Sequence, residues 1–234
     1  MLCPESQARN YHFILQQMSQ LHADFFDNDA QLVARALLGK VLRHRYQGRW
    51  LAARIIETEA YYAGERASHS SLGYTSARRA MFMPAGTIYM YHARGHPSLN
   101  VSTAGEGDAV LIKSAIPYED SLTSPDMLQF MGRAFPDNRP PDRLCKGQTL
   151  LCRALRLSIN DWNARQFDVS CFYIDDAGLA VSRIIQTTRL GIAPERDAHL
   201  PYRFIDYDFA SCCTKNPLTS RMLREGEGFH ILKT

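Results

Sequence analysis

The chain has 234 residues, of which 45% are hydrophobic and 22% charged, and its formal net charge at pH 7 is +3. This composition is typical of a globular protein whose core needs no disulfide staples. No apolar run approaches membrane-spanning length, so we expect no membrane partner. No linker divides the chain. We therefore expect one catalytic domain over residues 23–234, preceded by an extension over residues 1–22 that is helical or partly disordered.

Positive charge gathers in two zones. Residues 62–96 hold four arginines against one glutamate, and residues 130–165 hold seven lysines and arginines against three aspartates. Such zones suit a protein that contacts polyanions on one face, although charge runs are usually just solvated surface. The six cysteines form no C-x-x-C pair. We therefore expect reduced, mostly buried thiols in an intracellular protein, and no structural zinc.

Apolar periodicity and turn residues predict the regular elements in chain order. Helices are expected over residues 5–20, 30–38, 119–132 and 148–156, with Asp27 or Asn28 capping the second. Strands are expected over residues 41–46, 49–62, 87–92, 98–103, 109–116, 171–174, 179–188 and 202–205, with turns at Gln47-Gly48 and at residues 93–97. This alternation predicts a single α/β or α+β domain built on a curved, mainly antiparallel sheet.

The stretch Arg54–Tyr62 carries unusual chemistry for a strand. Side chains alternate faces along a strand, so Glu57, Glu59 and Tyr61 share one side. Two carboxylates and a phenol on one face are unfavourable to bury unless something binds there. The alternative is a solvated face of an edge strand.

Several separated motifs occur in a defined order. They are Arg-Ile-Ile-Glu-Thr-Glu-Ala-Tyr at 54–61, Ala-Ser-His-Ser at 67–70, Met-Phe-Met-Pro-Ala-Gly-Thr-Ile-Tyr-Met-Tyr at 81–91, Leu-Asn-Val-Ser at 99–102, segments 147–154 and 158–160, Arg-Leu-Gly-Ile at 189–192 and Pro-Tyr-Arg-Phe at 201–204. This set resembles the alkyladenine (3-methyladenine) DNA glycosylase family of base-excision repair. The resemblance spans about residues 23–206.

The resemblance implies a single domain around a curved antiparallel sheet, with a protruding β-hairpin that enters the DNA minor groove. It also implies a monofunctional enzyme that rotates an alkylated or deaminated purine out of double-stranded DNA and hydrolyses its bond to deoxyribose, without metal or cofactor. The protein is then expected to act as a monomer in the cytoplasm or at the nucleoid (in the nucleus of a eukaryote).

The resemblance also assigns roles to individual residues. Glu59 matches the catalytic glutamate, which stabilises the developing positive charge on the sugar and deprotonates water. The base pocket is assigned to Tyr61 and Tyr91 as aromatic walls, His69 as a stacking and hydrogen-bonding group, Asn100 as the floor that rejects the guanine amine, and Leu190, whose carbonyl helps hold the water. Glu57 is expected to be a buried structural carboxylate.

Two positions depart from the family. Arg94 stands where the family has an intercalating tyrosine, in a hairpin one residue shorter, and we expect it to contact DNA together with His92, His96 and Tyr89. Lys113 stands where the family has a water-orienting arginine. Its alternatives are a nucleophile that forms a Schiff base and an ordinary strand-end charge.

Two other function classes stay open. The first is a non-catalytic protein that binds damaged DNA on the same fold, although a binder has no need of Glu59. The second is a metal-dependent hydrolase that uses Glu57, Glu59 and His69, whose spacing fits no usual ligand pattern.

Overall fold

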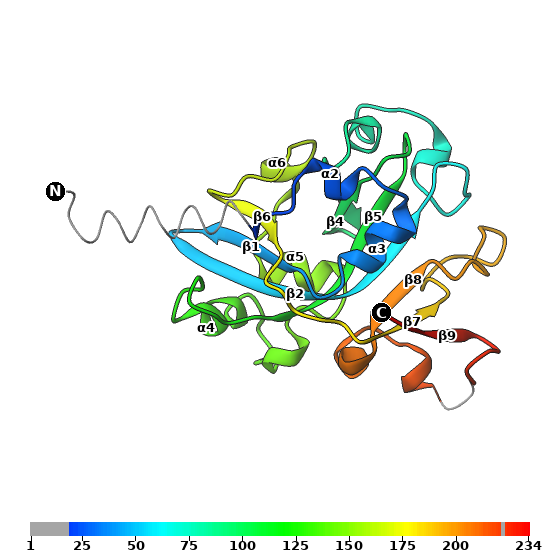
Figure 1. Cartoon of the computed structure of the whole chain (residues 1–234). Helices are drawn as coiled ribbons and strands as arrows, with labels where there is room; N and C mark the ends of the chain where they lie inside the picture. Colours follow the sequence, from blue (N-terminus) through cyan, green and yellow to red (C-terminus); the bar gives the residue numbers. More distant parts are fainter. Residues whose placement is uncertain (1–18, 221–222) are drawn as a thin grey trace.

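The structure is a computed structural model that describes residues 19–220 and 223–234. In this part of the chain, nine strands form one sheet and every strand pair is antiparallel. The strands are β1 (Val41–Tyr46), β2 (Arg49–Tyr61), β3 (Ile88–Ala93), β4 (His96–Ser102), β5 (Ala109–Pro117), β6 (Phe172–Asp175), β7 (Arg183–Thr187), β8 (Arg203–Asp206) and β9 (Phe229–Lys233). The helices are α2 (Ala23–Phe26), α3 (Ala30–Ala36), α4 (Met127–Gly132), α5 (Gln148–Ala154) and α6 (Ile159–Trp162). The predicted fold class, a single α+β domain around a curved antiparallel sheet, is confirmed (Figure 1).

Strand β2 is the centre of the sheet. One edge pairs with β5 over most of its length, and the other edge pairs first with β1 and then with β8. Ile55 and Ile56 are fully buried on opposite sides, each in a different hydrophobic cluster. The alternative of a solvated edge strand is therefore wrong, and the carboxylates of β2 lie inside the protein.

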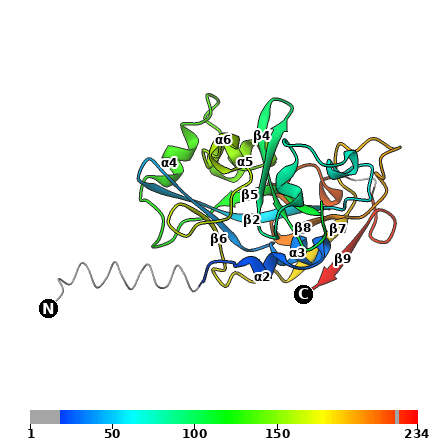
Figure 2. The same cartoon turned by 90° about the horizontal axis from the view of Figure 1, so that it is seen from above.

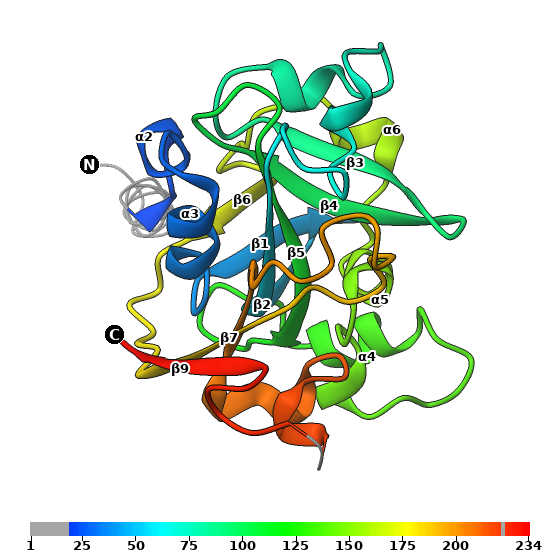
Figure 3. The same cartoon turned by 90° about the vertical axis from the view of Figure 1, so that its right-hand side faces the viewer.

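The hairpin β3–β4 projects beyond the rest of the sheet, as Figures 2 and 3 show. Its turn is only two residues long, Arg94-Gly95, with φ of 51° and 82°. Positive φ at both central residues is the pattern of a type I′ turn, whose twist matches that of the flanking strands. The predicted five-residue turn is thus too long, and the strands extend almost to the tip.

Two helices pack on the strands that carry the site. Helix α3 packs on β2 and β5, and α5 packs on β4 and β5. The first residue of α5 follows Gly147, whose φ of 109° turns the chain sharply into the helix. No helix in the described part of the chain is long and apolar enough to cross a bilayer.

Several predicted boundaries differ from the structure. The N-cap of α3 is Asp29, whose carboxylate accepts from the backbone of Gln31 and Leu32, and not Asp27 or Asn28. The helix predicted over 119–132 begins only at Met127, because Asp120 instead closes a local turn and pairs with a buried arginine.

Three short elements escaped prediction, and one predicted strand is shorter. Helices α2 and α6 and strand β9 were not expected, and β7 begins at Arg183 where residue 179 was predicted. The helix predicted over 5–20 falls almost wholly outside the described residues. Of its last residues, Gln20 forms a bridge with Asp175 at the edge of the sheet.

Candidate active site

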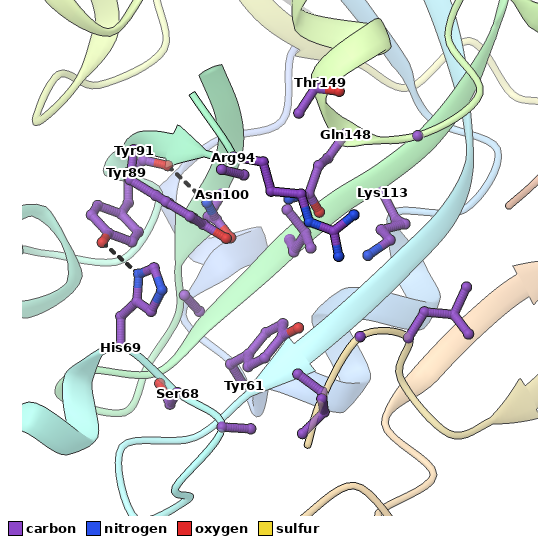
Figure 4. A pocket seen from close by; sticks show the side chains of 18 of the residues that line it. Tyr61, Ser68, His69, Tyr89, Tyr91, Arg94, Asn100, Lys113, Gln148 and Thr149 are labelled. Carbon is purple, nitrogen blue, oxygen red and sulfur yellow. Dashed lines mark hydrogen bonds between the residues drawn. The ribbon is translucent and has the colours of Figure 1, made fainter. Parts of the chain in front are cut away.

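A cavity of about 430 Å³ opens between the hairpin, β5, the start of α5 and the loop after β7 (Figure 4). Aromatic and polar side chains share its wall. They include Tyr61, His69, Tyr89, Tyr91, Arg94, Asn100, Leu111, Lys113, Gln148 and Leu190. A volume of this size lies within the range of small-molecule sites. All but two of these residues were assigned to the site from the sequence; the exceptions are Leu111 and Gln148.

Glu59 lies directly beneath this cavity and is fully buried. Its Oε2 accepts a 2.7 Å hydrogen bond from the Tyr61 hydroxyl, and its Oε1 lies 3.3 Å from Lys113 Nζ. The backbone N–H of Leu190 donates to the same Oε1 at 3.4 Å. Since Tyr61, Lys113 and Leu190 all line the cavity, the carboxylate is separated from it by its own hydrogen-bonding partners.

Glu57 has a different environment from Glu59. Its Oε1 accepts from Arg203 Nε at 2.7 Å and from the Thr214 hydroxyl at 2.6 Å, while Ser114 and the Thr214 backbone N–H donate to Oε2. Burial alone raises the pKa of Glu57, but the Arg203 charge and these donors outweigh it and lower the pKa overall. Arg203 on β8 neutralises Glu57 and the other donors hold both of its oxygens, which favours the structural role expected for it.

Strands β2, β3 and the loop after β2 bring three predicted base-binding rings together. Tyr61 lies on one side, and Tyr91 and His69 lie together with ring centroids 4.3 Å apart. Burial lowers the pKa of His69, and the charges of Arg196 and Arg78 lower it further. His69 is therefore a neutral ring at pH 7, which can stack on a cationic base without repelling it.

Asn100 and Leu190 complete the predicted set. The Asn100 side-chain amide donates to the Tyr89 backbone carbonyl at 3.1 Å, so its orientation in the cavity is fixed. Leu190 follows β7 in the chain and lies at the cavity wall next to Glu59. The structure thus gathers Glu59, Tyr61, His69, Tyr91, Asn100, Lys113 and Leu190 around one cavity.

Comparison with known proteins gives the family. A model of the methylpurine-DNA glycosylases matches residues 24–209. A Pseudomonas savastanoi pv. phaseolicola protein named "Putative 3-methyladenine DNA glycosylase" is 57% identical over 198 residues, which cover 83% of this chain and 89% of the relative. Proteins with the same name from Pseudomonas aeruginosa (strain LESB58) and Anaeromyxobacter sp. (strain Fw109-5) are 53% and 35% identical, covering 89% and 79% of this chain and 88% of each relative.

The chain belongs to the methylpurine-DNA glycosylase family. This confirms the resemblance inferred from the motifs, and the matched residues agree with the predicted span. Methylpurine-DNA glycosylases are DNA-repair enzymes that hydrolyse N-glycosyl bonds in base excision. Membership of this family makes DNA the expected substrate of the protein.

The arginine at the hairpin tip reaches back over the cavity of this glycosylase. Arg94 is exposed, and its guanidinium lies close to Gly191. A Cβ added to this glycine would lie 3.9 Å from Arg94 Nη2. Its side chain thus spans the cavity mouth from the hairpin to the loop after β7 (Figure 4). His92 and His96 are exposed on the hairpin and do not line the cavity.

Tyr89 was grouped with the DNA-contacting residues, but it lies inside the cavity. It is almost fully buried, and its hydroxyl lies 3.0 Å from His69 Nδ1. Its ring stacks on Tyr91 with centroids 5.6 Å apart. From this position Tyr89 supports the rings of His69 and Tyr91, both predicted to bind the base.

A β-bulge aims Lys113 at Glu59. In a regular antiparallel ladder Lys113 would pair with Glu57. Here the register shifts, so that Ser114 pairs with Glu57 and Ile112 pairs with Thr58. Lys113 is left without a partner in β2, and bulges commonly redirect a side chain in this way. Its ion pair with Glu59 makes an ordinary strand-end charge the wrong interpretation.

Among the residues that the structure describes, no group of three or more His, Cys, Asp and Glu side chains could hold a metal ion. Glu57 is held by Arg203, whereas His69 contacts tyrosines on the far side of the cavity. The ligand set of the metal-dependent alternative is therefore not assembled.

Sequence reasoning missed four side chains at the site. Leu111 and Gln148 line the cavity, and Arg189 and Glu65 lie behind Tyr61. A charged residue within the Arg-Leu-Gly-Ile motif was the available signal for Arg189. The partner of that arginine was not visible, because the two are 124 positions apart in the chain (189 minus 65).

Proposed function

We propose that this protein is a monofunctional DNA glycosylase that excises alkylated or deaminated purines after they are rotated out of the duplex. The observation that carries the proposal is the position of Glu59, buried against a cavity whose walls are Tyr61, Tyr91 and His69. A carboxylate beside a stacking slot is what N-glycosidic hydrolysis needs.

The reaction follows from the charges of the site. Breaking the bond builds positive charge on the sugar, which the Glu59 carboxylate stabilises while it accepts a proton from the attacking water. The water attacks the anomeric carbon as the base leaves. Lys113 and the Leu190 backbone hold Glu59 in place from the cavity side.

Selectivity for damaged bases follows from a small energy balance. Extrusion of a base costs a few kcal/mol, and stacking on aromatic rings returns about 1–3 kcal/mol. A cationic alkylpurine gains a further ~0.5–2 kcal/mol by cation–π attraction. For normal purines the extrusion cost and the stacking gain roughly cancel, whereas extrusion of weakly paired or cationic bases into the cavity is favourable. The amide of Asn100 is proposed to reject the exocyclic amine of guanine.

The monofunctional mechanism is favoured by the environment of Lys113. Its Nζ lies 3.3 Å from Oε1 of the proposed base, a position that suits a group holding Glu59 better than one attacking the sugar. The proposed nucleophile is water. The proposed substrate is double-stranded DNA with damaged purines, acted on by a monomer inside the cell, at the chromosome.

The test is excision from duplexes that carry 3-methyladenine, 7-methylguanine, hypoxanthine or ethenoadenine, followed by alkaline cleavage. Wild type should release at least one of these bases, and Glu59→Gln should bind the same duplex and release none. Glu106→Gln, on an acidic residue outside the cavity, serves as the matched control. Binding without release by wild type would favour the non-catalytic alternative, and full excision by Glu59→Gln would exclude Glu59 as the base.

A further inference from the structure

A buried arginine lies behind the aromatic wall of the cavity. Arg189 follows β7, its side chain is fully buried, and it does not line the cavity. Its guanidinium carbon lies 4.5 Å from the ring centroid of Tyr61, and its Nη1 donates to the Ala60 carbonyl at 2.8 Å. Since Tyr61 lines the cavity, its ring separates this cation from the cavity.

Glu65 balances the charge of that arginine. Its Oε2 lies 2.5 Å from Arg189 Nη2, and its side chain is 9% exposed. Its Oε1 accepts from the Tyr62 backbone N–H at 3.1 Å, which fixes the carboxylate in the loop after β2. Burial raises the pKa of Glu65 and the Arg189 charge opposes this rise. The pair has no role in the proposed hydrolysis itself.

A charge behind an aromatic ring alters what the front of the ring attracts. The front face of Tyr61 attracts a cation through the negative face of its π system. An uncompensated guanidinium on the back would oppose this attraction, because a stacked base would lie only roughly 9 Å from it. The Glu65 carboxylate cancels most of this field, so the ring remains attractive to a cationic base.

We infer that Arg189 and Glu65 form a positioning pair that holds Tyr61 while keeping its cavity face selective for cationic over neutral damaged bases. Arg189 fixes the ring by stacking and by its bond to Ala60, and Glu65 removes the electrostatic penalty of that arginine. The inference rests on the proposed glycosylase function and specifies which class of lesion the site favours.

The test compares one cationic base, 7-methylguanine, with one neutral base, hypoxanthine, in the same duplex sequence. For wild type, Glu65→Gln and the double variant Glu65→Gln/Arg189→Gln, single-turnover excision gives the ratio of the two rates. Glu65→Gln should lower the ratio about twentyfold, the effect of one charge at that distance for an effective dielectric constant near 20. The double variant removes both charges, so its ratio should return toward the wild-type value even where both rates fall.

A purely structural role predicts a different result. If the pair only supports the loop, both variants should slow excision of the two bases by the same factor, and such a constant ratio would overturn the inference. Thermal unfolding of each variant shows whether part of the protein is unfolded. The ratio of the two excision rates does not depend on the amount of folded protein. A wild-type protein that releases neither base would refute the proposed function and this inference with it, whereas wild-type activity with an unchanged ratio refutes the inference alone.

Discussion

The Tyr61 hydroxyl donates a 2.7 Å hydrogen bond to Oε2 of Glu59, two residues before it on the same face of β2. Burial and the neighbouring Glu59 carboxylate raise the pKa of Tyr61 well above its usual value, so the phenol remains a donor at neutral and moderately alkaline pH. The proposed stacking ring and the proposed catalytic carboxylate are therefore one rigid unit, which strand geometry sets.

Removal of this hydroxyl tests the coupling. Tyr61→Phe keeps the stacking area but leaves Glu59 without one of its donors. A hydrogen bond to a charged group contributes about 1.5–3 kcal/mol, so we expect excision to slow by roughly 10- to 150-fold while affinity for lesion DNA changes little. Tyr46→Phe, on a ring that does not line the cavity, is the control. Undiminished excision by Tyr61→Phe would mean that the bond has no part in catalysis.

Lys113 provides a second prediction. Lys113→Met leaves the buried Glu59 without its cation, and we expect excision to fall by on the order of 100-fold, as when one preorganised electrostatic group is removed from an active site. Lys113→Arg restores the charge and should retain most of the activity. Borohydride should trap no protein–DNA adduct with wild type. An adduct that disappears in Lys113→Met would instead establish the Schiff-base mechanism.

The sequence predicted which residues form the site better than it predicted the different roles of Glu57 and Glu59. Glu57 and Glu59 have the same side chain on the same predicted strand face, so alternation alone cannot separate them. What separates them is Arg203 on β8, 146 positions beyond Glu57, and the bulge that places Ser114 opposite Glu57. Both are long-range features that no local pattern contains.

Local signals were reliable where they were strong. The end of β1 and the start of β2 follow directly from the hairpin turn signal at Gln47-Gly48. Strand β9 was missed because Phe229–Lys233 is short and partly exposed, and it exists through pairing with β7. The start of α4 was misplaced because the carboxylate of Asp120 is committed to Arg43. Tertiary partners overrode propensity in both cases.

The Glu57–Arg203 pair gives a prediction about stability. Glu57→Gln removes a buried charge and leaves Arg203 unpaired, which typically destabilises a protein by about 3–5 kcal/mol. For a chain of this length we expect the melting temperature to fall on the order of 10 °C. Differential scanning calorimetry at pH 7 measures the change. The double variant Glu57→Gln/Arg203→Met, which leaves no buried charge, should recover part of the loss; a double variant no better than the single would contradict this account.

The same pair predicts the direction of the pH dependence. The pKa of Glu57 is lower in the folded protein than the ordinary value of 4.5. Its contribution to stability is therefore complete above pH ~4.5 and is lost as the pH falls through the folded-state pKa. Between about pH 5 and pH 3, wild type should lose more stability than Glu57→Gln, because the variant has no carboxylate to protonate. Parallel acid transitions for the two proteins would show that Glu57 does not drive acid unfolding.

The hairpin tip allows DNA contact to be separated from folding. Arg94 has a φ of 51°, which an L side chain adopts at some cost, whereas Asn-Gly is a preferred type I′ turn. Arg94→Asn should therefore preserve or strengthen the hairpin while it removes the cation. We expect weaker binding to duplex DNA and a salt dependence whose slope is smaller by about one unit, as for the loss of one phosphate contact. Arg45→Gln, on β1 and outside the cavity, is the matched loss of charge and should leave both unchanged. If Arg94→Asn binds DNA as wild type does at every salt concentration, Arg94 does not contact the backbone, and its side chain serves only to cover the cavity mouth.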